Sequence, residues 1–425
     1  MFINPGGPGD TGVGLVQGLG DEIDSWGGGR FDVVSWDPRG TNASTPVRCF
    51  TSTRSEARFW KGVTIPTTPA ASERYARKVA ELARRCGKVT GWLLPHISTA
   101  DTARDLDYLR RLVGEPELTY VGLSYGSYLG QTYANMFPGR VRAMLLDGIV
   151  DPVPYAKGAE ARVASQASGA DALFNQLLSV CENAGPKRCA LAGGRQTAAE
   201  RVNGLFARVK RAPIPAPKAR PPGALTYSDL LVSQFNFLRL PETWPQDAKD
   251  LAAAVGGDGS ALLSMTRQLE TPAGLMGAAT SAAISCADAS AQMGLRSWPR
   301  VIGRLSREDR LYGTLLGWWL WAPCASWPVR GQDNYRGPWN ATTKNPILLI
   351  GNRYDPATPY INAVRSARRL GNAVLLTFNG YGHTSIHDPS ACINRARVAY
   401  LVNLITPPKG TVCQADKTPF APGFG

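Results

Sequence analysis

The sequence predicts an α/β protein in which a mostly parallel sheet, flanked by helices, is interrupted by a large helical insertion. Short β-branched and aromatic runs alternate with helical stretches near both ends of the chain, a pattern typical of a parallel sheet. Between residues 147 and 345 the strand pattern almost disappears, and Ala, Gly and Leu recur at helical spacing. Of the 425 residues, 44% are hydrophobic and 19% charged. This globular composition excludes general disorder.

The expected strands are short apolar runs that lie near the two ends of the chain. There are five of them, at residues 31–36, 119–123, 141–147, 346–351 and 373–378. Because three precede residue 150 and two follow residue 345, the sheet should be assembled from both ends. We therefore expect a core formed by residues 1–154 and 336–425, with residues 155–335 inserted as a helical cap before the fourth of these strands.

Helices beside these strands are indicated by hydrophobic periodicity and by end signals. One is expected over residues 99–113, with Ser98 or Thr99 as its N-cap. Its predicted buried face consists of Leu106, Leu109 and Leu112 or Val113. A second helix is expected over residues 127–137. Within the insertion, the proline-rich segment 212–223 is expected to form an extended polyproline loop.

Charge and hydropathy patterns exclude two classes of protein. Lys and Arg outnumber Asp and Glu by 47 to 33, which gives a formal net charge of +14. These basic residues are scattered in blocks no longer than two, so nucleic-acid binding is not expected. The most apolar stretch, residues 311–321, is interrupted by Gly313, Thr314 and Gly317. No transmembrane helix is therefore expected.

The eight cysteines indicate structural disulfides and an oxidising compartment, so we expect an extracellular protein. Pairing of chain neighbours is the simplest arrangement: Cys49–Cys86, Cys181–Cys189, Cys286–Cys324 and Cys392–Cys413. The alternative is a set of buried free thiols in a cytosolic protein. The chain begins Met1-Phe2-Ile3 without the features of a signal peptide. With no CxxC motif and only three histidines, no metal or cofactor is expected.

The strongest chemical signal is the Gly-Leu-Ser-Tyr-Gly sequence at residues 122–126. It follows one predicted strand directly and precedes the predicted helix 127–137. In a strand-to-helix turn of this kind, flanking glycines allow a strained serine to be presented at the sheet edge. The helix N-terminus also favours a developing oxyanion. We therefore expect Ser124 to be a nucleophile, with an ordinary glycine-rich turn as the alternative.

A serine nucleophile requires a histidine as its base. His383 lies in a glycine-containing loop after the predicted strand 373–378. It also follows the serine, in the chain order nucleophile, acid, histidine. His387, four residues later, is the alternative base. His96 precedes the serine and is interpreted as a packing residue.

The acid that orients this histidine should follow a strand and precede the histidine. Asp355 comes just after the predicted strand 346–351 and 28 residues before His383. It would accept the Nδ1 hydrogen and stabilise the imidazolium. Asp147, at the end of the predicted strand 141–147, is the competing candidate.

The amino-terminal segment 4–9, Asn-Pro-Gly-Gly-Pro-Gly, is the expected oxyanion loop. Glycines there allow a backbone amide to approach a substrate oxygen. The expected donors are the amides of Gly7 and Tyr125, the latter being the residue after the nucleophile. A phosphate-binding loop is excluded, because the P-loop pattern and the Rossmann spacing are both absent.

Taken together, these motifs resemble the α/β-hydrolase branch that contains bacterial secreted tripeptidyl and prolyl aminopeptidases. The matching segments run almost end to end, at residues 4–9, 36–46, 122–141, 146–152, 351–359 and 379–383. The resemblance implies an α/β-hydrolase fold, with the helical cap before the strand of the acid and a triad of Ser124, Asp355 and His383. Members of that branch carry further residues before the segment 4–9. This chain either begins late or lacks the first edge strands.

The expected function is therefore that of a serine hydrolase that cleaves short peptides from the N-terminus. A carboxylesterase is the alternative, and an inactive hydrolase-fold binding protein is a minor one. A carboxylate in the cap would bind the substrate ammonium, and Asp288 is the candidate because it lies among small residues; satisfaction by local amides is its structural alternative. Trp327 belongs to a tryptophan cluster with Trp318, Trp319 and Trp321 that either packs in the cap or lines an apolar cleft.

Overall fold

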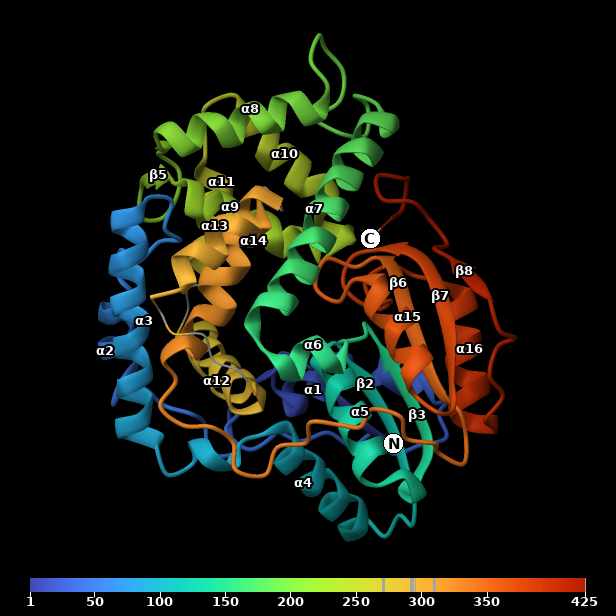
Figure 1. Cartoon of the computed structure of the whole chain (residues 1–425). Helices are drawn as coiled ribbons and strands as arrows, with labels where there is room; N and C mark the ends of the chain where they lie inside the picture. Colours follow the sequence, from blue (N-terminus) through green and yellow to red (C-terminus); the bar gives the residue numbers. More distant parts are fainter. Residues whose placement is uncertain (270–271, 291–293, 295, 309–310, 425) are drawn as a thin grey trace.

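The computed structural model describes residues 1–425 except 270–271, 291–293, 295, 309–310 and 425, and the side chains of 159, 269, 272–277, 308 and 320–321 are also outside the description. One side of the molecule contains a six-stranded sheet whose neighbouring strands are all parallel (Figure 1). In spatial order the strands are β1 (Phe2–Asn4), β2 (Leu118–Leu123), β3 (Val141–Asp147), β6 (Ile347–Tyr354), β7 (Ala373–Tyr381) and β8 (Val412–Gln414). The prediction of a mostly parallel sheet built from both chain ends is confirmed.

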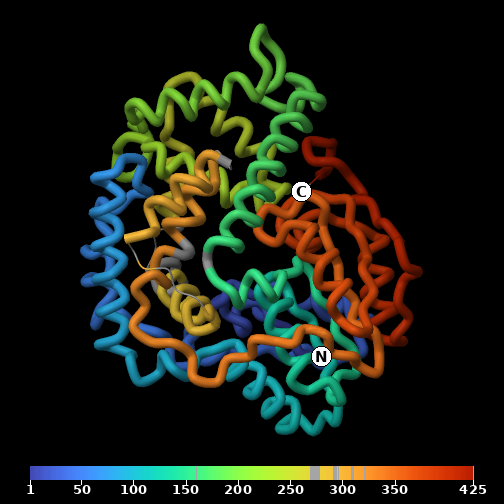
Figure 2. Tube along the Cα trace, viewed as in Figure 1, coloured from blue at the N-terminus to red at the C-terminus, as the bar shows by residue number. Residues whose placement is uncertain are grey.

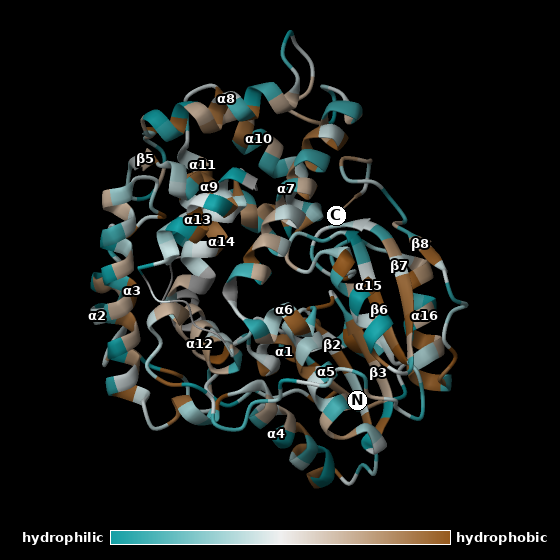
Figure 3. Cartoon of the chain, in the orientation of Figure 1, coloured by the Kyte–Doolittle hydropathy of each residue, from teal (hydrophilic) through white to brown (hydrophobic). Residues whose placement is uncertain are grey.

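Successive residues of the strands are buried on opposite faces of the sheet, as the two-residue period of a strand requires. Tyr120 and Leu146 belong to the cluster on one face, and Val121 and Leu145 to the cluster on the other. The helices that cover the first face are α4 (Thr99–Leu112), α5 (Tyr125–Met136) and α15 (Tyr360–Arg369). Those on the second are α1 (Gly12–Trp26) and α16 (Ala391–Asn403). Figure 3 shows the apolar character of the strands beside the mixed character of these helices.

Four of the five predicted strands are present, as β2, β3, β6 and β7; β3 has the predicted ends, and the ends of the other three differ by up to three residues. The expectation for residues 31–36 was wrong, because they form only an isolated bridge between Val34 and Phe2. Val34 exchanges backbone hydrogen bonds with Met1 and Ile3 on either side of that bridge. Because β1 is only three residues long, it cannot pair with the rest of this segment.

The predicted helices are present as α4 and α5. Ser98 is the N-cap of α4 and forms a capping box with Asp101, so the first of the two proposed caps is confirmed. Leu106 is buried and Leu109 is half-buried against the sheet. The expectation for the last turn was wrong, since Leu112 and Val113 are 63% and 52% exposed. The buried face continues instead through Arg110.

Between β3 and β6 the chain forms helices and one short hairpin. The elements are α6 (Pro152–Lys157), α7 (Ala159–Ala184), α8 (Ala198–Arg211), β4 (Ile214–Ala216), β5 (Gly223–Leu225), α9 (Tyr227–Leu238), η3 (Pro241–Thr243), α10 (Trp244–Val255), α11 (Ser260–Leu269), α12 (Pro272–Asp288), α13 (Trp298–Glu308), α14 (Tyr312–Leu316), η4 (Gly317–Trp321) and η5 (Ala322–Ser326). The expectation of a polyproline loop at 212–223 was wrong, because β4 and β5 pair there as an antiparallel hairpin. Pro215 lies in a two-stranded sheet, in which both strands are edges that tolerate proline.

An amino-terminal segment shares the hydrophobic core of this helical region. It contains α2 (Thr53–Trp60) and α3 (Pro69–Thr90), whose buried residues belong to the same cluster as those of α7, α9 and α14. Figure 2 shows α3 beside the segments of the insertion rather than beside the sheet. The η1 turn (Leu94–His96) returns the chain to the sheet. The predicted division at residues 154 and 336 therefore omits a third segment that packs with the insertion.

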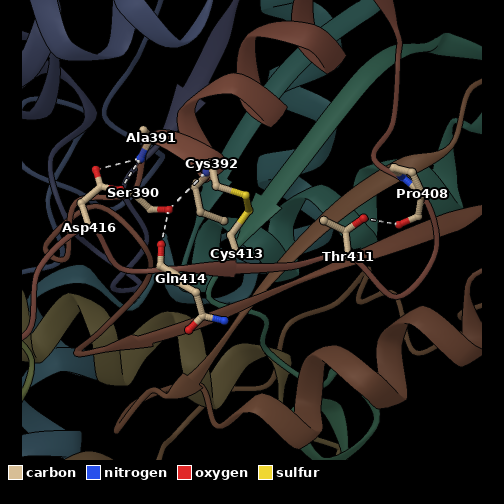
Figure 4. The surroundings of a disulfide bond; sticks show 9 residues. Ser390, Ala391, Cys392, Pro408, Thr411, Cys413, Gln414 and Asp416 are labelled. Atoms are coloured by element: carbon tan, nitrogen blue, oxygen red, sulfur yellow. Dashed lines mark hydrogen bonds between the residues drawn. A yellow bond between two sulfur atoms is a disulfide. The ribbon is translucent and has the colours of Figure 1, made fainter.

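The structure pairs the eight cysteines in the four neighbour pairs predicted from the sequence. Figure 4 shows the pair Cys392–Cys413, which joins α16 to β8 at the sheet edge. Beside it, the Asp416 carboxylate accepts hydrogen bonds from the Ala391 amide. Within the described ranges, no helix combines the length and hydrophobicity that a membrane crossing needs.

Candidate active site

Ser124 sits in a sharp turn between β2 and α5. Its backbone has φ 55° and ψ −121°, a left-handed conformation that is strained for a residue with a Cβ atom. A Cβ at Gly122 would lie 2.3 Å from the Gly126 carbonyl oxygen, and one at Gly126 would lie 2.6 Å from the Asn4 carbonyl oxygen. The Ser124 amide donates to the Asp147 carbonyl at 2.8 Å. The glycines of the motif are therefore required by close packing around the serine.

The loop after β1 lies directly against this turn. The Asn4 side chain accepts a hydrogen bond from the Gly6 amide at 3.0 Å. A Cβ at Gly6 would lie 2.9 Å from the Tyr125 nitrogen and 3.0 Å from the Ser124 Cβ. Gly7 follows with φ 101°. Among the described residues, neither the Gly7 amide nor the Tyr125 amide has an acceptor in the protein, so both donors remain available to a ligand oxygen.

Asp355 and His383 meet above the carboxyl ends of β6 and β7. The Nδ1 atom of His383 lies 2.9 and 3.0 Å from the two carboxylate oxygens of Asp355. Both side chains are almost fully buried. The pair was expected from the sequence, because each residue follows a strand and adjacent parallel strands end at the same edge of a sheet.

Four further donors hold the Asp355 carboxylate. The amides of Ala357, Thr358 and Thr384 donate to it at 2.8, 2.7 and 3.0 Å, and the Thr358 hydroxyl donates at 2.8 Å. Burial alone would raise the pKa of Asp355, but the charge of His383 and these hydrogen bonds hold the pKa below its ordinary value. An ionised carboxylate can therefore orient the imidazole at neutral pH.

Asp147, the competing acid, has other partners. Its carboxylate accepts from Arg397 Nη2 at 3.0 Å, from Ser385 Oγ at 2.6 Å and from the Ser385 amide at 3.1 Å. No hydrogen bond joins it to His383 among the described residues. It therefore anchors the loop that carries His383 rather than the imidazole itself.

The other two histidines have different surroundings. His387 Nδ1 lies 3.1 Å from the Glu242 carboxylate, and the side chain is partly exposed. His96 is exposed, and its carbonyl accepts a hydrogen bond from Arg39. Among the described residues, no hydrogen bond joins Ser124 to His383. Active sites without ligand often have such loose contacts, which tighten when substrate binds.

Asp288, the candidate for the substrate ammonium, is bound within the protein. Its carboxylate accepts from the Thr99 amide at 2.8 Å and from the Thr99 hydroxyl at 2.6 Å. The side chain is only 3% exposed, and burial raises its pKa to about 7. The structural alternative, satisfaction by a neighbouring amide, describes these contacts better than an open ammonium site does.

The tryptophan cluster is divided. Trp318 is buried against Tyr75, and Trp327 is 5% exposed. Trp319 is 37% exposed. The Trp321 side chain lies outside the described residues. Packing in the cap therefore describes Trp318 and Trp327 as the structure has them, and a substrate role for Trp327 stays a prediction.

Three supporting residues were not anticipated from the sequence. Thr358 lies only three residues after Asp355, in a turn that the aspartate begins by accepting from the amide two residues on, that of Ala357. Ser385 and Arg397 act on Asp147 across 238 and 250 residues. Contacts of that separation leave no local sequence signal.

Known protein families match both ends of this chain. The family model described as alpha/beta hydrolase fold matches residues 1–178, and the model described as TAP-like protein matches residues 311–413. The serine protease Hip1 of Mycobacterium tuberculosis is 32% identical to this chain, over 97% of this chain and 80% of its own length.

This chain belongs to the α/β-hydrolase family. The resemblance seen in the sequence motifs is thereby confirmed, as is the hydrolase class of the enzyme. The tripeptidyl aminopeptidase of Streptomyces lividans is 31% identical, over 99% of this chain and 77% of its own length. Carboxylesterase B of Mycobacterium tuberculosis is 30% identical, over 97% of this chain and 79% of its own length. The relatives of this α/β-hydrolase thus include both a peptidase and an esterase.

Proposed function

We propose that this α/β-hydrolase is a serine peptidase that removes short peptides from a free amino terminus. The observation that carries the proposal is the buried Asp355–His383 pair, at the same sheet edge as the strained Ser124. Peptide hydrolysis is favoured because the protease and the aminopeptidase are among its most similar relatives.

In the proposed mechanism, Ser124 Oγ attacks the substrate carbonyl carbon while His383 Nε2 takes the hydroxyl proton. The amides of Gly7 and Tyr125 donate to the oxyanion of the tetrahedral intermediate. The imidazolium, stabilised by Asp355, then protonates the leaving amine, and an acyl-enzyme remains on Ser124. A water molecule activated by His383 hydrolyses this ester and restores the serine.

The insertion, residues 155–335 in this proposal, acts as a cap that limits which substrates can reach the active site. It approaches the catalytic loop directly, because the Arg239 carbonyl accepts a hydrogen bond from the His383 amide at 3.0 Å. The protein is proposed to act outside the cytoplasm. Four disulfides favour an oxidising compartment.

A substrate panel tests the reaction class. Tripeptidyl amides with a free amine, the same peptides with an acetylated amine, and simple acyl esters are compared by kcat/KM. The proposal expects the free-amine peptides to be the best substrates. A carboxylesterase, the second candidate because of its 30% identical relative, would hydrolyse the esters and leave every peptide intact.

A further inference from the structure

We propose that helix α12 of the insertion holds the oxyanion hole in position through a chain of hydrogen bonds from Asp288 through Thr99 to Tyr125. This inference rests on the proposed function. Asp288 and Thr99 are positioning residues in it, since neither needs to touch the substrate.

The series of hydrogen bonds is continuous and buried. The Thr99 hydroxyl donates to Asp288 at 2.6 Å, and its oxygen lies 2.5 Å from the Tyr125 hydroxyl. When Asp288 is ionised, the one hydroxyl hydrogen of Thr99 goes to the carboxylate, and the Tyr125 hydroxyl is then the donor in the second bond. The three residues are 3%, 1% and 3% exposed. Water therefore does not compete for these bonds.

The position of Tyr125 links these hydrogen bonds to the catalytic step. It follows Ser124 directly and begins α5, so its amide is one of the two expected oxyanion donors. Its ring is fixed at the far end by Thr99 and packs against Tyr128 and Tyr155. An anchored ring limits rotation of the backbone unit that carries the amide. A small displacement of such a donor is costly, because catalysis depends on its preorganised position.

The same helix also contacts the loop that supplies the other donor. A Cβ at Gly9 would lie 3.1 Å from the Thr280 methyl group, so α12 and the oxyanion loop are in close contact. The Thr280 hydroxyl donates to the Gly40 carbonyl at 3.1 Å. One helix of the insertion thus supports both sides of the oxyanion hole.

The carboxyl end of α12 is itself fixed. Cys286 is bonded to Cys324, and the Ala287 carbonyl accepts a hydrogen bond from the Gly331 amide. Asp288 follows these anchors immediately. A rigid attachment is what a positioning role requires, since a mobile carboxylate would not fix Thr99.

The test compares Thr99→Val, which removes the hydroxyl, with Thr99→Ser, which keeps it, and with Tyr125→Phe, which keeps the ring and the amide. We expect kcat to fall about tenfold to a hundredfold in Thr99→Val and Tyr125→Phe, with KM unchanged. Thr99→Ser should restore wild-type turnover. Tyr128→Phe is the matched control, because it removes another buried phenol of α5 outside this chain of bonds.

Two further readouts separate positioning from general destabilisation. A peptide aldehyde forms a tetrahedral adduct whose oxygen needs the same donors. Its affinity should fall in parallel with kcat in both variants. The double variant Thr99→Val, Tyr125→Phe should be no slower than the worse single variant, because both changes break the same series of hydrogen bonds.

The inference is overturned if Thr99→Val and Tyr125→Phe, folded and with Ser124 still labelled by a fluorophosphonate, turn over at the wild-type rate. A rise in KM for free-amine peptides alone would also overturn it and would return Asp288 to substrate binding. Failure of the fluorophosphonate to label wild-type Ser124 would instead refute the proposed function.

Discussion

The buried ion pair between Asp147 and Arg397 should matter for stability far more than for the chemical step. The two side chains are 0% and 2% exposed, and the Arg397 guanidinium also lies 4.3 Å from the centre of the Trp26 ring. In Asp147→Asn the arginine would remain buried without its counter-charge. Breaking a buried pair in this way costs about 3–5 kcal/mol of unfolding free energy.

This free-energy cost can be converted into an expected fall in the melting temperature. An entropy of unfolding of about 2.1 cal/mol/K per residue gives about 0.9 kcal/mol/K for the chain of 425 residues. The Tm of Asp147→Asn should therefore fall by about 3–6 °C. The matched control is the double variant Asp147→Asn, Arg397→Met, which removes both charges and should recover part of the loss.

Activity of the same variants, assayed well below the Tm, completes the experiment. We expect kcat of Asp147→Asn to stay within about tenfold of wild type, because His383 is held by Asp355 instead. An unchanged Tm would contradict the inference that Asp147 anchors the histidine loop. A loss of activity as large as that of Asp355→Asn would make Asp147 the catalytic acid.

Three other predictions concern single sites. Asp355→Asn should fold normally and lose about 10⁴-fold in kcat; stopped assays on purified protein check this, and a tenfold loss would refute the assignment. Burial raises the pKa of Asp247 to about 8, so the folded state keeps a proton that the unfolded chain loses above about pH 4, and stability should decline from pH 4 to 8. Asp247→Asn should flatten this decline in thermal melts, and parallel curves for both proteins would contradict it. Cys392→Ser with Cys413→Ser should lower the unfolding free energy by about 2–4 kcal/mol in urea titrations, and a smaller loss than 1 kcal/mol would show that the link is dispensable.

The sequence was most informative where structure depends on neighbours in the chain. The serine turn was predictable because strand, glycines and helix are contiguous around Ser124. The Asp355–His383 pair was predictable because parallel strands place their following loops at one edge. The disulfides join cysteines that are adjacent in the chain order.

Features that depend on distant partners were missed. Residues 31–36 have strand composition, but β1 is too short to pair with more than Val34. The small residues around Asp288 suggested a functional carboxylate. Only the fold shows that Thr99, 189 residues earlier, donates hydrogen bonds to both of its oxygens. Tertiary contacts of this kind override local patterns.

The most direct test of the central claim is the mass of the acyl-enzyme. Full-length protein is mixed with an activated peptidyl ester, quenched in acid, and analysed by intact mass and by peptide mapping. The account predicts one added acyl group, located on Ser124, that is absent from Ser124→Ala. An acyl group on another residue, or full turnover by Ser124→Ala, would contradict it.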